Sequence, residues 1–112
     1  MPVQTGIPRK IRMTPAHVTR QTEPFVAACA RAAETVVMLG NSHFHVLDVC
    51  IDLPRPTIRV RECEAVRRMI ERGDAVYYAR SHEPGWGVMR GGQFQLNGCR
   101  VIWTESQRQV RP

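Results

Sequence analysis

Two runs of alternating hydrophobic and polar residues lie on either side of a short connection between His43 and Arg61. Alternation with a period of two is typical of β-strands that bury one face, so this segment predicts a β-hairpin. A turn at residues 53–56 would set Asp48 opposite Arg61. The same register places five aliphatic side chains together in the expected core: Leu47, Val49, Ile51, Ile58 and Val60.

A helical pattern precedes the hairpin, over residues 22–39. Thr22 is a residue type that caps helices, Pro24 suits a first turn, and the alanine-rich run after it has high helix propensity. Gly40 is expected to end the helix. The β-branched residues 35–37 leave the start of a strand as an alternative for the last turn. The predicted buried stripe consists of Phe25, Ala28, Cys29, Ala32, Val36 and Leu39.

A second helix is predicted over residues 63–72, with Gly73 closing it. Its apolar residues recur at helical spacing: Cys63, Val66, Met69 and Ile70. Charged residues on its outer face are spaced for ion pairs between Glu64 and Arg68 and between Arg67 and Glu71.

The remaining sequence predicts strands. Residues 74–81 alternate as a strand, residues 82–87 form a loop, and residues 88–90 form a short strand that Gly91 and Gly92 end.

The dipeptide Asn97-Gly98 predicts a tight hairpin between residues 93–96 and 99–104, because both residues accept positive φ angles. One face of this hairpin is expected in the core, with Phe94, Leu96, Cys99, Val101 and Trp103.

The order of elements, α-β-β-α-β-β-β, predicts an α+β domain in which an antiparallel sheet of hairpins carries two helices on one face. We assign residues 22–105 to this domain. Residues 1–21 contain several prolines and no apolar period, so we expect a basic extended arm there. Residues 106–112 are expected to be a polar tail.

Positive charge changes the interpretation of this fold. The chain has a net charge of +6, and arginine supplies all but one of its basic residues. A guanine- and cytosine-rich coding sequence would give this bias, and so would use of guanidinium groups to bind phosphates. The candidate nucleic-acid-binding residues are the cations of the arm and of the first hairpin: Arg9, Lys10, Arg12, Arg20, Arg55 and Arg59.

The other cations are weaker candidates for nucleic-acid binding. We expect Asp48 to bind Arg61, and we expect the arginines of the second helix to pair with its own glutamates. Arg100 is a further cation, and an ordinary solvated surface is the alternative for the whole set. Tyr77 or Tyr78 would be an exposed ring, because consecutive strand residues cannot both face one core.

Trp86 lies in a glycine-flanked turn and is the best candidate for an exposed indole ring. Nucleic-acid bases stack on such rings, but exposed tryptophans also anchor protein partners. The second functional hypothesis is therefore a protein-interaction module, either an inhibitor of a host or defence complex or a small homo-oligomer. An unpaired sheet edge would favour the same function.

Patterns for catalysis and metal binding are weak. His43 and His45 would point to the same side of a strand, as two metal ligands can, yet partly exposed histidines are the preferred interpretation. The four cysteines form no close pair and are expected to be small buried residues. No nucleophile, base and orienting group stand at motif spacing, so we expect a non-enzymatic protein without cofactor or small-molecule substrate.

No apolar run approaches the roughly 20 residues that span a bilayer, and the N-terminus lacks the apolar segment of a secretory signal. The expected compartment is a bacterial-type cytoplasm.

Residues 55–60 and 98–103 are similar to segments of small arginine-rich proteins of phages, prophages and other mobile elements, whose activity is uncharacterised. The resemblance implies an accessory protein that acts by binding nucleic acid or a host protein. It assigns no catalytic or binding residue.

Overall fold

The protein folds into two helices and five strands, seen in a computed structural model that describes residues 18–83 and 87–107. The element order confirms both the predicted α+β class and the predicted sequence of helices and strands. In chain order the elements are α1 (Glu23–Asn41), β1 (Val46–Cys50), β2 (Thr57–Val60), α2 (Glu64–Arg72), β3 (Val76–Glu83), β4 (Gly87–Leu96) and β5 (Cys99–Gln107).

The five strands form one sheet in the order β1-β2-β5-β4-β3. The hairpins β1–β2, β3–β4 and β4–β5 are antiparallel, whereas β2 and β5 run parallel. The sheet is therefore mixed, and the expectation of a wholly antiparallel sheet is wrong at this one pair. A parallel pair needs a long crossover connection, which α2, β3 and β4 provide here.

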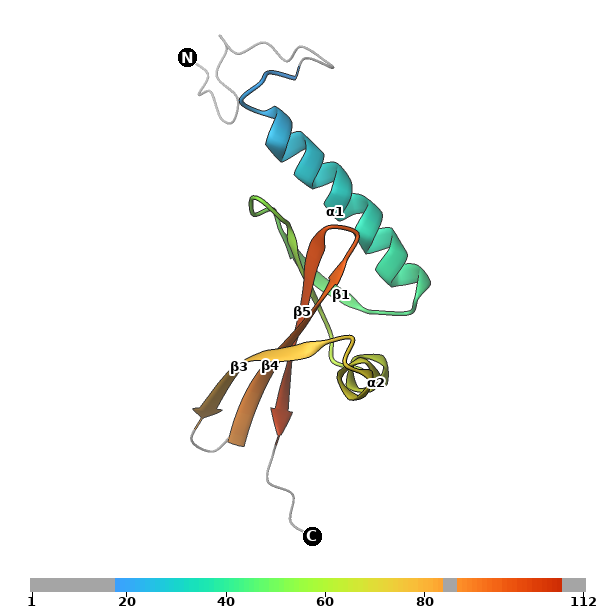
Figure 1. The fold of residues 1–112 in the computed structure, drawn as a ribbon, viewed down its shortest axis with the longest axis vertical. Coiled ribbons are helices and arrows are strands. Elements are labelled where there is room, and N and C mark those ends of the chain that lie inside the picture. The colour runs from blue at the N-terminus through green and yellow to red at the C-terminus, as the bar shows by residue number, and fades with distance from the viewer. Residues whose placement is uncertain (1–17, 84–86, 108–112) are drawn as a thin grey trace, which may run out of the picture.

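Both helices pack on the same face of the sheet, as predicted. Figure 1 shows α1 lying across the turns at one end of the sheet and α2 seen end-on beside the middle of it. Leu39 of α1 and Val66 of α2 join side chains of β2, β4 and β5 in one hydrophobic core. The buried residues of this core are Leu39, Ile58, Val60, Val66, Ala75, Phe94, Cys99, Val101 and Trp103.

The first hairpin pairs in a register two residues away from the predicted one. Val49 lies opposite Ile58 and Asp48 opposite Arg59, with an irregularity between Val46 and Asp48. Ile58 is fully buried, but Leu47 and Val49 are each 41% exposed. The expectation that all five aliphatic residues are buried is wrong, because β1 is an edge strand of the described sheet and no described strand pairs with its outer side.

Helix α1 is longer than predicted and buries a narrower stripe. It continues through Gly40 to Asn41, and the chain leaves it through His43, whose φ is 67°. Phe25 and Cys29 were expected in the core, but both are exposed. The first turns of α1 extend past the end of the sheet, so these residues have little sheet beneath them (Figure 1). The buried residues of α1 are Ala28, Ala32, Thr35 and Leu39.

Helix α2 agrees closely with its prediction. Gly73 ends it in the left-handed conformation, with a φ of 83° that glycine adopts without strain. The expected ion pair between Glu64 and Arg68 is present at 3.7 Å. Arg67, however, binds Glu62 at 3.0 Å and not Glu71.

Strand β4 runs without interruption through Gly91 and Gly92, where we expected it to end. Aromatic rings from the neighbouring strands occupy the space above both glycines: Tyr78 lies over Gly91 and Trp103 over Gly92. The glycines are therefore parts of the strand that make room for rings.

The Asn97-Gly98 turn confirms the prediction from local sequence. Both residues have positive φ angles, 51° and 77°, and Leu96 pairs with Cys99 beside them. The face with Phe94, Val101 and Trp103 is buried as expected. Strand β5 continues to Gln107, beyond the predicted start of the polar tail at residue 106.

A buried acid holds the far end of β5 in place. The carboxylate of Glu105, which is 7% exposed, accepts hydrogen bonds from Arg90 Nη2 at 2.9 Å, Trp103 Nε1 at 2.9 Å and Tyr77 Oη at 3.2 Å. Partial burial of the Tyr77 hydroxyl, and then the negative charge of Glu105, raise the pKa of Tyr77. This cluster ties β3, β4 and β5 together on the helix side of the sheet.

Candidate functional site

The sheet face opposite α1 and α2 gathers polar and cationic side chains from all five strands. Because strand residues alternate between faces, the residues that flank the buried positions of β2, β4 and β5 point to this side. None of the described helices packs against it. We call this surface the open face and define it by Asp48, Arg55, Thr57, Arg59, Tyr78, Gly91, Gln93, Gln95, Arg100, Ile102 and Thr104.

Arg59 binds Asp48 on the neighbouring strand. Its Nε and Nη2 atoms donate to the same carboxylate oxygen at 3.0 and 2.7 Å. The predicted pair between Asp48 and Arg61 is therefore wrong, because the hairpin register differs. Arg61 is exposed, and it makes no ion pair or side-chain hydrogen bond within the described part of the chain. Both side chains of the Arg59 pair are about half exposed, so their attraction is worth less than about 1 kcal/mol and Arg59 can change partner.

Arg55 and Arg100 are held by neutral amides. Arg55 reaches the open face from the β1–β2 connection, and its Nη1 donates to Gln95 Oε1 at 2.9 Å. Arg100 Nε donates to Gln93 Oε1 at 2.6 Å. A neutral partner orients a guanidinium group without cancelling its charge. Both arginines therefore keep donors and positive charge for an anion.

The guanidinium of Arg100 also lies 4.6 Å from the ring centroid of Tyr78, as a cation–π contact. The two residues belong to β5 and β3, which β4 separates. Gly91 of β4 makes their contact feasible, because the Tyr78 ring lies across it in the space where a side chain would otherwise stand. Tyr78, and not Tyr77, is thus the tyrosine of the open face.

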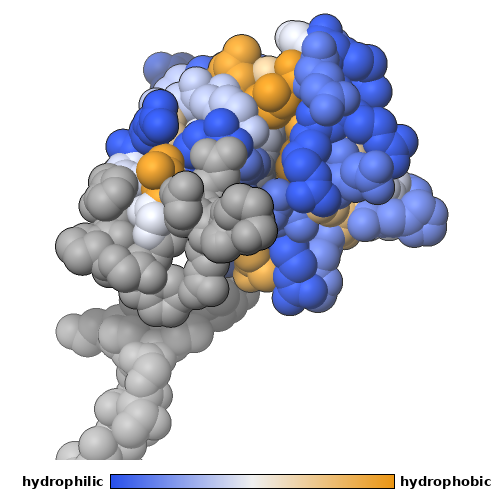
Figure 2. Space-filling view, turned by 90° about the horizontal axis from the view of Figure 1, so that it is seen from below, coloured by the Kyte–Doolittle hydropathy of each residue, from blue (hydrophilic) through white to orange (hydrophobic). Residues whose placement is uncertain are grey.

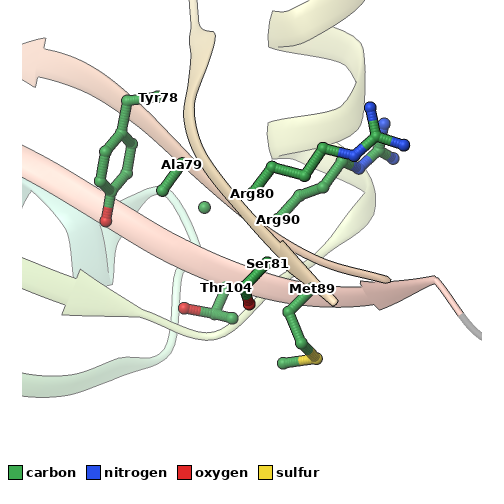
Figure 3. A pocket seen from close by; sticks show the side chains of 8 residues that line it. Tyr78, Ala79, Arg80, Ser81, Met89, Arg90 and Thr104 are labelled. Atoms are coloured by element: carbon green, nitrogen blue, oxygen red, sulfur yellow. The ribbon is translucent and has the colours of Figure 1, made fainter. Parts of the chain in front are cut away.

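A shallow hollow of about 220 Å³ lies next to Tyr78. Ala79, Ser81, Met89, Gly91 and Thr104 contribute to its lining. Figure 3 shows the Tyr78 ring on one side, the Ser81 and Thr104 side chains on another, and the Arg80 and Arg90 side chains pointing away. The hollow therefore combines an aromatic ring with two hydroxyl groups.

The structure brings together two of the six predicted cations, Arg55 and Arg59. Arg20 is exposed just before α1, which packs on the opposite face of the sheet, so Arg20 does not join them. Arg9, Lys10 and Arg12 lie outside the described residues, as does the predicted protein anchor Trp86. Arg100 was not predicted as a site residue. Its alternation with Val101 in the second hairpin was the signal that could have placed it beside Gln93 and Gln95.

The histidines do not share a strand as expected. His43 has a positive φ and β1 begins only at Val46, so His43 and His45 both precede the strand. Across residues 18–83 and 87–107, no three His, Cys, Asp or Glu side chains gather as a metal site would require.

Two cysteines differ from their expected burial. Cys99 is buried and Cys63 partly buried, but Cys29 and Cys50 are exposed. The Cys50 thiol donates a hydrogen bond to Asp52 Oδ1 at 3.4 Å. This hydrogen bond, and then the negative charge of Asp52, raise the pKa of Cys50.

Neither of the two described helices is long and apolar enough to cross a membrane.

Comparison with known proteins places the chain in a family. No curated protein and no solved structure matches it. A family model matches residues 12–106, a range that includes α1, α2, β1 to β4 and all but the end of β5. The chain therefore belongs to the family that this model describes as "Uncharacterised protein".

Proposed function

We propose that this protein binds single-stranded nucleic acid on its open face and has no enzymatic activity of its own. One observation carries the proposal: Arg55 and Arg100 stand on a sheet face that no described helix covers, where Gln95 and Gln93 orient them and no acid among the described residues neutralises them. Two oriented guanidinium groups next to an aromatic ring are suited to a phosphate chain with attached bases.

Electrostatics favours a polyanion as the ligand. Arg55, Arg59, Arg61 and Arg100 stand on or beside the open face, where Asp48 neutralises only Arg59. Arginines that contact phosphates release counterions from the nucleic acid, and this release supplies affinity without reading sequence. Binding should therefore weaken steeply with salt.

Tyr78 and the hollow beside it favour a single strand with unpaired bases. A base can stack on a tyrosine ring or on a guanidinium plane, and such stacking is worth about 1–3 kcal/mol per base. The hydroxyl groups of Ser81 and Thr104 could then bond the edge of a base in the hollow. A double helix would instead need a helix or ribbon that projects into a groove, and the open face is a sheet surface.

The genomic context that we propose is a bacterial phage or other mobile element, in which the protein acts as a cytoplasmic accessory factor. The similarity of residues 55–60 and 98–103 to proteins of such elements supports this context.

Fluorescence anisotropy tests the function directly. The parent protein is titrated into labelled single-stranded and duplex oligonucleotides of about 16 nucleotides, near the upper site size of comparable surfaces. We expect tighter binding of the single strand and a loss of affinity as salt rises from about 50 to about 200 mM.

Matched arginine variants locate the surface. Arg55→Ala and Arg100→Ala should each weaken binding and lower the salt slope by about one. Arg68→Ala is the control, because it removes the same charge from α2 on the other side of the sheet. Absence of binding, binding without salt dependence, or an equal loss with Arg68→Ala would overturn the proposal.

A further inference from the structure

Helix α1 is apolar on two opposite sides. Its buried side is formed by residues 28, 32, 35 and 39. An α-helix has about 3.6 residues per turn, so residues 26, 30, 33 and 37 form a second stripe on the side away from the sheet. All four residues of this outer stripe are exposed: Val26, Ala30, Ala33 and Val37.

The outer stripe leaves apolar side chains without cover from the described residues. Val37 is 61% exposed and Val26 is 48% exposed. Phe25 and Met38 are also exposed, but each lies about 100° around the helix from the stripe residue next to it in sequence, outside the stripe. The end of the molecule seen in Figure 2 differs, since its described surface is mostly hydrophilic with small separate hydrophobic patches. A large exposed apolar surface on one element marks an interaction site.

The charges of α1 exclude two kinds of partner. The charged residues of α1 are Glu23, Arg31 and Glu34, which leave the helix with a net negative charge. Helices that lie on anionic membranes carry Lys and Arg on their polar side, and nucleic acid also requires cations. The outer stripe therefore fits an apolar protein surface.

The spacing of the stripe is symmetric. From Val26 to Val37 the steps are four, three and four residues, and the residue types read Val, Ala, Ala, Val in both directions. An interface between two identical chains related by a twofold axis must be complementary to itself, and a palindromic stripe meets this condition when two helices run antiparallel. Few other partners would require such symmetry.

We infer that two copies of this chain associate through α1, packed antiparallel about a twofold axis that passes midway between Ala30 and Ala33. Val26 then lies opposite the partner's Val37, and Ala30 opposite the partner's Ala33. The small alanines at the centre let the helix axes approach to about 8 Å, the close end of helix packing distances. No charged side chain lies in the stripe, so none is buried without a partner.

The antiparallel arrangement has two further consequences. It sets the N-terminal end of each helix beside the C-terminal end of the other, which is the favourable alignment of helix dipoles. It also leaves both open faces accessible, because α1 packs on the other side of the sheet. Association therefore does not depend on the proposed nucleic-acid binding, and it can be tested without a ligand.

Sedimentation equilibrium of the full chain tests the interface. We expect the parent to have twice the mass of one chain, and Val26→Glu and Val37→Glu each to have the mass of a single chain. Val76→Glu on β3 is the matched control, because Val76 is 55% exposed on the other edge of the sheet, and this variant should remain a dimer. Circular dichroism checks that each variant is folded. We expect Val26→Glu and Val37→Glu to fold, because both positions are exposed on a helix and glutamate is a good helix former.

Disulfide trapping tests the orientation independently. In a chain with the exposed Cys29 and Cys50 replaced by serine, Ala30→Cys and Ala33→Cys are prepared separately and oxidised alone or mixed. The antiparallel interface predicts that the mixture forms disulfide-linked dimers several-fold faster than either variant alone. A monomeric parent, a dimer that Val76→Glu disrupts but Val37→Glu does not, or faster linking of each variant to itself would overturn the inference.

Discussion

Gly92 lies against the indole ring of Trp103, its cross-strand partner on β5. A Cβ atom on residue 92 would stand 2.6 Å from Cε2 of that ring, closer than side chains approach one another. Trp103 is the largest of the fully buried side chains. The core has room for its ring only because β4 has no side chain at residue 92. The pair fixes how β4 and β5 pack.

Replacement of Gly92 by alanine should therefore be costly. We expect Gly92→Ala to lower the free energy of unfolding by about 3 kcal/mol, because the new methyl group displaces the ring from a packed core. Gly40→Ala is the matched control: apart from its own helix backbone and chain neighbours, no atom of the described residues lies within 4 Å of its Cβ position, and its place inside α1 predicts a gain of about 0.5–1 kcal/mol. Urea denaturation measures both, and a Gly92→Ala protein as stable as the parent would contradict this packing.

Glu105 should contribute more to stability than a surface acid. Glu105→Gln removes the charge that neutralises Arg90 in a largely buried cluster. Because Arg90 is itself 25% exposed, we expect a loss of about 2–3 kcal/mol, below the range for fully buried pairs. Asp74→Asn, which breaks the exposed pair with Arg72, should cost less than about 1 kcal/mol. Equal losses for the two variants in thermal or urea unfolding would refute the difference.

Local chemistry explains which parts of the fold could be predicted from sequence. Asn97-Gly98 and Gly73 require positive φ angles, and each marks its turn or helix end without help from distant residues. The continuation of β4 through Gly91 and Gly92 could not be predicted in this way. It depends on the rings of Tyr78 and Trp103, which come from other strands. In the sequence alone, a pair of glycines indicates a bulge or the end of a strand.

The candidate site also contains residues that could be predicted from sequence and contacts that could not. Charge and position in the first hairpin predict Arg55 and Arg59 as site residues. The partner of Arg59 followed from the hairpin register, in which Cys50 pairs with Thr57 and Asp48 therefore lies opposite Arg59 and not Arg61. The connection over residues 51–56 sets this register and is longer than the predicted turn at residues 53–56. The contact between Arg100 and Tyr78 depends on strand order, because β3 and β5 meet only across β4.

Removal of the Asp48 charge should strengthen nucleic-acid binding. Asp48→Asn frees Arg59 from its carboxylate, so one more guanidinium group can contact phosphate, and the salt slope should become steeper by about one. Asp74→Asn is again the control, since it removes one negative charge beside Arg72, away from the open face. Anisotropy titrations over a range of salt measure both slopes. An unchanged or weaker affinity for Asp48→Asn would show that Arg59 does not contact the ligand.

Cys50 should react more slowly with thiol reagents than an equally exposed cysteine of ordinary pKa. Its hydrogen bond to Asp52 and the charge of that residue raise its pKa, so less of it is thiolate at mildly alkaline pH. Asp52→Asn removes the negative charge, lowers the pKa and should speed alkylation of Cys50. Cys29, also exposed, is the internal reference in the same protein. Mass spectrometry after timed iodoacetamide treatment follows each site, and an unchanged rate at Cys50 would contradict this role of Asp52.

The central claim, that the open face holds a nucleic-acid strand, is tested most directly by amide chemical-shift mapping in a titration with a single-stranded oligonucleotide. We expect the largest shifts at Arg59, Tyr78, Gln93, Gln95 and Arg100, and small shifts along α1 and α2. Shifts confined to the helices, or no shifts when the oligonucleotide is in excess over the protein, would contradict binding at the open face.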